Sequence, residues 1–408
     1  MTTILNHQHR IKILCLTSHS PEGQDAGARL RARHVFQQLQ RFGDVQVVLA
    51  GPYEEYSAAP DPVPNPSRPS EIFNFHSWKI TGLADRIRYE LGSSYLNTHG
   101  NQATQGDRRR LLELIAEHDL VWVHSLRVAN GFNIWKWPKT ILDIDDIPSD
   151  VSRTVMVHGQ GLEVKLRAFR KFCMWKRHEA RIFERFPAMT VCSRSDLARF
   201  GSSERVFLVP NGYDAPSEAI VRSAAGSVKI GFMGSLEYPP NANGLRWFLR
   251  KVWPLILKEK PNAILRVAGR HSDHPEWNHP PNVHGLGWVA DSDSEVAGWA
   301  MMIVPIFEGG GTRVKISHAF SRKCPVVSTK LGAYGYEVAD GRELLLANTA
   351  SDFASACLRF LKDPDLANRL AHTAWVTFLE NWTWDANAPR LEKAIRFVLD
   401  GGGENPSL

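Results

Sequence analysis

The sequence feature that most constrains the fold is a repeated alternation of short β-rich runs with longer helical patterns. Residues 27–43 have their apolar side chains near helical spacing, and β-rich runs occur at 11–18, 45–52, 120–125, 140–146, 188–193 and 205–212. Nearly continuous apolar strands separated by helices are typical of a parallel sheet that is covered on both faces. The pattern therefore predicts an α/β protein with doubly wound, Rossmann-like sheets.

The alternation pauses and then starts again, which predicts two domains. After a small, polar segment at 213–227, a helix is expected over 242–258, and β-rich runs return at 228–235, 263–269, 282–289, 300–306 and 324–329. We expect Rossmann-like domains at 1–215 and 228–385, and a C-terminal helix in 386–408 that returns to the first domain. Ligands of such domains bind beyond the carboxyl ends of the strands, so a binding cleft is expected where the two sheets face each other.

Charge, cysteine content and hydropathy bear on the partners and the location of the protein. The net charge of +6 suggests an anionic ligand, an anionic membrane surface or nucleic acid, without choosing among them. The five cysteines form no CxxC pair, so neither a zinc site nor a disulfide framework is indicated, and a reducing cytoplasm fits best. No apolar run is long enough for a transmembrane span, so any membrane contact is expected at the surface.

The stretch FEGGGTRVKISHAF, which begins at residue 307, has the features of an anion-binding loop. A helix is expected to start near Thr312, and free backbone N–H groups at a helix start bind anions. The glycines at 309–311 let the backbone approach a phosphate closely, while Arg313 and Lys315 add the positive charge that suits a diphosphate. A flexible glycine-rich loop is the alternative, and the missing GKS or GKT excludes a Walker A loop.

Two further groups of polar residues are expected at the ends of strands in the first domain. Asp143, Asp145 and Asp146 end the run 140–146, where they would hold a metal-bound sugar nucleotide, contact sugar hydroxyls or loop amides, or cap the local structure. Gly27 lies in the first βα turn, before a basic helix. The missing GxGxxG in this turn argues against a nicotinamide cofactor.

In the second domain, Ser235 ends the run 228–235 and Asn241 lies in the loop that follows it, and both are expected to reach the cleft from this loop. The backbone around Trp288 comes after another strand, where its groups can bind a nucleobase edge. Packing in the core is the alternative for Trp288.

A basic amphipathic segment at 165–186 is a candidate for membrane contact. Helices of this kind lie on anionic lipid, although core packing of the apolar stripe is the alternative. The segment 72–95 is the other candidate for contact with a membrane or an acceptor.

Together these motifs resemble glycosyltransferase family 4, in its GGGTR-type subgroup. The matching pieces span nearly the whole chain: GARLRARHVFQQL, ILDIDDIPSD, RHEARIFERFPAMTVCSRSD, VFLVPNGYD, IGFMGSLEYPPNANGLRWF, the run from GGGTR to RELLLA, and ENWTW. PNG-x-D before a new strand and GGGTR-x-K before PVVST are specific in combination. The resemblance implies the GT-B fold and a retaining, metal-independent, hexosyltransferase-like enzyme, with a nucleoside-diphosphate sugar as co-substrate and no other cofactor.

The resemblance also implies roles for individual positions. Gly27 approaches the donor diphosphate and sugar, and Asp145 falls near a cleft residue, often His, beside the transferred sugar. Gly310, Gly311 and Thr312 supply backbone donors to the diphosphate.

Two departures from the family pattern concern the donor. Ser235 and Asn241 stand where many members place Arg and Lys, so Arg313 and Lys315 are expected to supply the charge instead. His318 stands where a Glu usually accepts hydrogen bonds from the nucleotide ribose. A carboxylate accepts two such bonds, whereas a neutral imidazole accepts one and donates one. If residue 318 contacts the ribose directly, the substitution His318→Glu is expected to tighten nucleotide binding.

The expected function is retaining transfer of a sugar from a nucleoside-diphosphate sugar to an acceptor hydroxyl, in the synthesis of cell-surface polysaccharide or glycolipid. The expected partners are the donor, a glycan or lipid-linked acceptor, and an anionic membrane contacted peripherally from the cytoplasm, with no nucleic acid. One rival is a non-catalytic protein that binds sugar nucleotides or glycans, in which His318 marks lost activity. The other is an epimerase or dehydrogenase.

Overall fold

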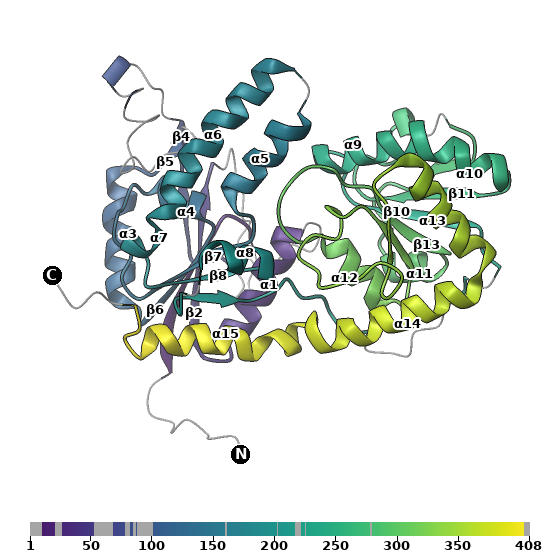
Figure 1. Cartoon of the computed structure of the whole chain (residues 1–408). Coiled ribbons are helices and arrows are strands. Elements are labelled where there is room, and N and C mark those ends of the chain that lie inside the picture. Colours follow the sequence, from purple (N-terminus) through teal and green to yellow (C-terminus); the bar gives the residue numbers. More distant parts are fainter. Residues whose placement is uncertain are drawn as a thin grey trace. The chain divides into compact units, whose positions relative to one another are not determined.

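The chain divides into two compact units. Unit 1 consists of Met1–Val209 and Ala388–Leu408, and unit 2 consists of Pro210–Asn387. Most of their helices and several of their strands are labelled in Figure 1. The structure is a computed structural model that describes residues 10–20, 27–52, 68–77, 82–84, 87, 101–159, 161–201, 203–216, 222–224, 226–277 and 280–403.

Within the described residues, unit 1 is built on a parallel sheet of seven strands in the order β3-β2-β1-β6-β7-β8-β9. These strands are β1 (Ile11–Thr17), β2 (Gly43–Gly51), β3 (Glu71–Asn74), β6 (Leu120–His124), β7 (Thr140–Ile144), β8 (Ala188–Val191) and β9 (Val206–Leu208). A separate antiparallel pair consists of β4 (His76–Ser77) and β5 (Asn101–Gln102). The helices are α1 (Gly27–Leu39), α3 (Gln105–Glu117), α4 (Leu126–Gly131), α5 (Pro148–His158), α6 (Leu162–Ala180), α7 (Ile182–Arg185), α8 (Arg194–Arg199) and α15 (Trp384–Leu399).

Successive side chains of each strand point to opposite faces of the sheet. Because these side chains are apolar on both faces, helices cover both faces of this sheet. In β1, Ile13 packs in one buried cluster with Leu39 of α1 and Ile395 of α15. The next residue, Leu14, packs in a second cluster with Leu111 of α3 and other helical side chains. Both faces of the strands are therefore buried, as their nearly continuous apolar sequences require.

A buried ion pair connects α1 to β7 inside unit 1. The Arg31 guanidinium donates to both carboxylate oxygens of Asp143, at 2.9 and 2.5 Å, and both side chains are fully buried. Thr190 donates to the same carboxylate at 2.6 Å. Burial alone would raise the pKa of Asp143, but the charge and hydrogen bonds of Arg31 hold it below its usual value. Asp143 is therefore part of the internal structure of this unit.

Unit 2 contains a parallel sheet of six strands, counted over the described residues, in the order β12-β11-β10-β13-β14-β15. The strands are β10 (Lys229–Met233), β11 (Ile264–Ala268), β12 (Val283–Gly285), β13 (Met301–Val304), β14 (Val326–Ser328) and β15 (Leu345–Leu346). The helices are α9 (Pro239–Trp247), α10 (Trp253–Glu259), α11 (Ser292–Ala297), α12 (Val314–Ser321), α13 (Ala350–Lys362) and α14 (Pro364–Asn381), with a π-turn η1 (Phe248–Val252) and a 3₁₀ turn η2 (Pro275–Trp277). Buried clusters lie on both faces of this sheet.

The predicted fold class, parallel Rossmann-like sheets covered by helices, is confirmed in both units. Some boundaries differ from the expected ones for local reasons. The helix expected over 242–258 is interrupted by η1, where the N–H of Trp253 bonds back to the carbonyl of Phe248 just before Pro254, which has no N–H to donate. The helix after the glycine loop begins at Val314 rather than near Thr312.

Candidate functional site

Most of the residues predicted to bind the ligand lie together in unit 2, at the carboxyl ends of β10 and β13. These two strands are hydrogen-bonded neighbours in the sheet. Gly234 follows β10, and a Cβ added to it would lie 2.7 Å from the Asn241 amide nitrogen and 3.0 Å from the Lys315 ammonium. The fold thus joins the loop after β10, the start of α9 and the first turn of α12 into one polar site.

Lys315 lies at the centre of this site. Its ammonium donates to the Asn241 side-chain oxygen at 2.8 Å and lies 4.5 Å from the centre of the Phe232 ring. Burial and, to a smaller extent, the charge of Arg313 lower the pKa of Lys315 to about 7. A lysine with this pKa is poised to gain a proton when an anion binds beside it. Asn241, predicted to contact the donor, holds this lysine in place.

The glycine loop has a backbone conformation that depends on glycine. Gly309 and Gly311 have φ values of 94° and 66°, in the left-handed region. A Cβ on Gly309 would approach the Tyr238 hydroxyl at 3.0 Å and the Arg313 guanidinium at 3.1 Å. The start of α12 has no side-chain cap, so its first N–H groups are suited to bind an anion.

Arg313 is folded back onto the loop that precedes it. Its guanidinium donates to the carbonyl oxygens of Gly310 and, at 3.1 Å, of Glu308. Arg313 is only 9% exposed as a residue, and the Tyr336 hydroxyl donates to the Arg313 carbonyl at 3.0 Å. Thr312, directly before Arg313, accepts a hydrogen bond of 2.7 Å from the Asn211 side-chain amide. In this structure the Arg313 side chain is therefore engaged with the backbone of the glycine loop.

His318 is buried on α12 and contacts a carboxylate. Its Nε2 lies 2.9 Å from Asp293 Oδ1, and its ring stacks on Tyr213 with centroids 4.9 Å apart and an interplanar angle of 22°. Arg322, one turn further along, donates to the other Asp293 oxygen. Burial alone would raise the pKa of Asp293, but the hydrogen bonds from His318 and Arg322 hold it well below its usual value.

Trp288 and Ser235 complete the set of predicted residues in unit 2. Trp288 is 58% exposed, so the alternative that it packs in the core is wrong. The adjacent Gly287 has a φ of 66°, and its N–H donates to the Ser272 hydroxyl at 2.9 Å. The Ser235 hydroxyl accepts from the Glu237 N–H at 3.3 Å, and its carbonyl accepts from Asn241 at 2.9 Å.

Gly27 and Asp145 belong to unit 1. Gly27 is the first residue of α1, and residues 21–26 of the preceding turn lie outside the described residues. Asp145 follows β7, is half-buried and accepts a bond of 3.3 Å from the Cys192 thiol. No cluster of three metal-binding side chains occurs in the part of the chain that the structure describes. The roles of Gly27 and Asp145 stay predictions.

Three residues of the unit 2 site were not among the predicted ones: Asn211, Tyr213 and Asp293. Asn211 and Tyr213 belong to the VFLVPNGYD motif, which was noted for its specificity but given no contact. Asp293 comes from α11, in a segment without a recognisable motif. Only the fold brings it to His318.

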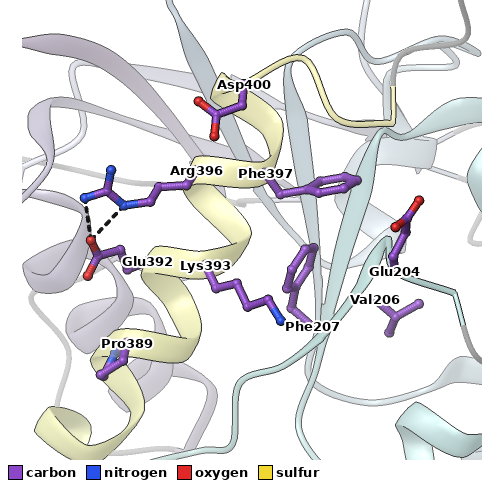
Figure 2. A pocket seen from close by; sticks show the side chains of 9 residues that line it. All are labelled: Glu204, Val206, Phe207, Pro389, Glu392, Lys393, Arg396, Phe397 and Asp400. Carbon is purple, nitrogen blue, oxygen red and sulfur yellow. Dashed lines mark hydrogen bonds and ion pairs between the residues drawn. The ribbon is translucent and has the colours of Figure 1, made fainter.

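Unit 1 also contains a pocket of about 600 Å³ beside its edge strand. Figure 2 shows side chains of β9, such as Phe207, facing side chains of α15, such as Lys393 and Phe397. Arg396 and Glu392, on the same helix, pair with each other at 2.6 Å. None of the predicted site residues lines this pocket.

Two features bear on membrane contact. Among the described residues, no helix is both long and apolar enough to cross a bilayer. The amphipathic segment expected at 165–186 is divided between α6, which ends at Ala180, and the short helix α7. Helix α6 runs antiparallel to α5 as a hairpin (Figure 1). Most of the other candidate segment, 72–95, lies outside the described residues.

Comparisons with known proteins agree with this architecture. Residues 227–363, which contain the unit 2 site, match the family described as Glycosyl transferases group 1. Solved structures that share the fold include sucrose-phosphate synthase from Thermosynechococcus elongatus, which is 15% identical with a TM-score of 0.67 over 96% of this chain and 100% of that chain. The glycosyltransferase WaaG, involved in lipopolysaccharide biosynthesis, is 14% identical with a TM-score of 0.59 over 96% and 100% of the two chains. HepE from Anabaena, solved with UDP and glucose, is 13% identical with a TM-score of 0.60 over 95% and 99%.

These likenesses define the class by its fold: the chain has the GT-B fold, and residues 227–363 are similar to the glycosyl transferases of group 1. A curated relative is an uncharacterized 44.6 kDa protein in the cps region of Klebsiella pneumoniae, 29% identical over 161 residues. That match covers 37% of this chain and 42% of the relative.

Proposed function

We propose that this protein is a retaining glycosyltransferase that moves a sugar from a nucleoside-diphosphate sugar to an acceptor hydroxyl. The observation that carries the proposal is the site around Lys315, where a buried ammonium, a glycine loop and an uncapped helix start converge at the carboxyl edge of a Rossmann-like sheet. The family match includes this site, and HepE, of the same fold, was solved with UDP and glucose.

The proposed reaction needs stabilisation of a leaving diphosphate. As the bond between the sugar C1 and the diphosphate oxygen breaks, negative charge develops on that oxygen. The Lys315 ammonium and the N–H groups at the start of α12 stabilise this charge without a metal ion. The acceptor oxygen bonds to C1 from the same face, and its proton passes to the departing phosphate. Arg313 contributes by fixing the glycine loop through the Glu308 and Gly310 carbonyls.

We further propose that the α5–α6 hairpin contacts an anionic membrane, where a lipid-linked acceptor would be found. The start of α6 is exposed, and its first ten residues carry four cations and one carboxylate. The apolar side chains exposed at this end of the hairpin are Val157, Leu162, Val164, Leu166 and Phe169. Apolar groups among cations are the chemistry that binds an anionic lipid surface. A role in cell-surface polysaccharide or glycolipid synthesis follows from such an acceptor.

A panel of nucleoside-diphosphate sugars tests the reaction. We expect the purified protein to release a nucleoside diphosphate from one donor, faster with an acceptor present, and the activity to persist in EDTA. The anomeric configuration of the product, read by NMR, should match that of the donor. Lys315→Met should lower turnover by about a hundredfold or more, as the loss of one preorganised donor does. If a nucleotide sugar binds but no donor is consumed, the protein is a binding protein with the same fold.

A further inference from the structure

We propose that Asp293 is the hydroxyl-binding residue for the ribose of the nucleotide, and that His318 and Arg322 are the positioning residues that hold its carboxylate. This inference rests on the proposed function, because it assigns the nucleoside part of the donor whose diphosphate binds near Lys315. It differs from the expectation that residue 318 itself contacts the ribose.

The exposure of the three side chains separates their roles. The Asp293 side chain is 47% exposed, whereas that of His318 is 5% exposed and that of Arg322 is 13% exposed. His318 is also covered by the Tyr213 ring, which stacks on it at 4.9 Å. A ligand therefore reaches the carboxylate but not the imidazole, and His318 acts on the ligand only through Asp293.

The hydrogen bonds around Asp293 leave it suited to accept from a diol. His318 contacts one carboxylate oxygen at 2.9 Å and Arg322 the other, so each oxygen is held by one partner from α12 or its C-terminal end. Each carboxylate oxygen accepts more than one hydrogen bond, so accepting capacity is left on the exposed side. A fixed carboxylate with two oxygens matches the two adjacent hydroxyls of ribose, and an acidic residue has this role in dinucleotide-binding Rossmann folds.

The position along α12 agrees with a nucleotide that has its phosphates at the helix start. His318 follows Val314, the first residue of α12, by four residues, which is about 6 Å along the helix axis at 1.5 Å per residue. The carboxylate that His318 holds is therefore displaced from the diphosphate site toward the interior of the same helix. Its element, α11, follows β12, so Asp293 also lies beyond the carboxyl end of a strand of this sheet.

The test is the discrimination between ribose and deoxyribose. Affinities of the full-length protein for UDP, GDP and ADP are measured by calorimetry alongside those of their 2′-deoxy and 3′-deoxy counterparts. We expect the wild type to prefer the ribonucleotide by roughly tenfold or more, as for a hydrogen bond to a charged group. In Asp293→Asn this preference should fall toward one, while the residual affinity of the diphosphate persists.

Asp291→Asn is the matched control. Asp291 lies two residues away and accepts the Ser294 N–H at 2.9 Å as the cap of α11, a role that Asn can keep. Its discrimination ratio should equal that of the wild type. Thermal unfolding of each variant shows whether the fold is retained.

His318→Glu distinguishes the two roles for residue 318. Direct ribose contact predicts tighter nucleotide binding in this variant. Under our proposal the new carboxylate lies against Asp293, so like charges repel and ribonucleotide binding weakens. His318→Gln, which can still donate to Asp293, should retain much of the discrimination.

The outcomes separate this inference from the proposed function. If none of the nucleoside diphosphates binds the wild type, the proposed function fails. If they bind and Asp293→Asn keeps the full preference for ribose, the assignment of Asp293 is wrong while the proposed function stands. Tighter binding in His318→Glu also overturns the assignment.

Discussion

Lys315 is the residue whose protonation most directly couples to the proposed chemistry. Its ammonium is fixed by Asn241 and the Phe232 ring, and burial has lowered its pKa to about 7. A neutral amine gives a diphosphate little attraction, whereas an ammonium in the same position gives much. The bound diphosphate in turn favours the protonated lysine, so ligand and proton bind cooperatively.

We therefore predict that nucleoside diphosphate affinity falls as pH rises above 7. In that range the free protein loses the Lys315 proton while the complex keeps it, so the dissociation constant rises by up to tenfold per pH unit. The terminal phosphate, with a pKa of about 6, is already ionised there and does not obscure the effect. Calorimetry from pH 7 to pH 8.5 measures the dissociation constant of the nucleoside diphosphate, together with the proton uptake on binding.

Two substitutions at the same position serve as controls. Lys315→Arg keeps its charge throughout this range, so its affinity should be independent of pH. Lys315→Met should bind weakly at every pH. A wild-type affinity that does not change between pH 7 and pH 8.5 would contradict the prediction.

The buried ion pair of Arg31 and Asp143 predicts a large effect on stability. Removing one partner leaves the other charge buried without compensation, which costs about 3–5 kcal/mol. Asp143→Asn should therefore lower the free energy of unfolding by several kcal/mol in a urea titration. The exposed pair of Arg10 and Asp44, at 68% and 67% side-chain exposure, is the matched control. Asp44→Asn should cost less than about 1 kcal/mol, and equal effects of the two changes would contradict this reading.

At the scale of elements, the α5–α6 hairpin predicts selective lipid binding. The protein should sediment with vesicles that contain anionic phosphatidylglycerol and much less with vesicles of phosphatidylcholine, and 1 M salt should weaken the binding. Replacing both Leu162 and Phe169 by Asp should abolish most of it, because apolar contact is lost and charge repulsion is added. Leu255→Asp, at a residue on α10 that is 40% exposed, should leave it unchanged. Binding that persists in the hairpin variant would place the contact elsewhere.

The elements also show what a sequence pattern can predict. Buried strands such as β6 (LVWVH) and β13 (MMIV) were predictable because apolar side chains fill both faces. The edge strands β3 and β15 were not, because four and two residues are too few to show a pattern. Their pairing depends on the neighbouring strand more than on their own sequences.

Some residues of the candidate site could be predicted from the sequence, and others could not. The glycine loop was predictable because Gly309 and Gly311 adopt backbone conformations that favour glycine. The orientation of Arg313 was not, because the sequence shows a cation but not the carbonyl oxygens that it contacts. Asp293 was not predictable either, since it is 25 residues from His318 in sequence and only the packing of α11 beside α12 joins them.

At the scale of the whole molecule, unit 1 depends on a helix from the other end of the chain. Ile395 of α15 is completely buried with Ile13, Leu39 and Leu120. We predict that Ile395→Ala destabilises unit 1 by about 2–5 kcal/mol, as large-to-small changes in a core do. Hydrogen exchange should become faster in β1 and β6 but not in β10 and β13. Leu399→Ala, at a residue 39% exposed, is the control, and a uniform change in exchange would contradict the prediction.

The discontinuity of unit 1 also sets an order of events during synthesis. The ribosome completes Pro210–Asn387 before it makes the residues of α15 that cover the β1 and β6 face. At about 5–20 residues per second, that takes roughly ten to thirty-five seconds. Throughout this interval the nascent N-terminal half exposes apolar side chains that chaperones can bind. Unit 2 is continuous in sequence and can fold in the meantime, so the half of the protein that is made first is the last to become native.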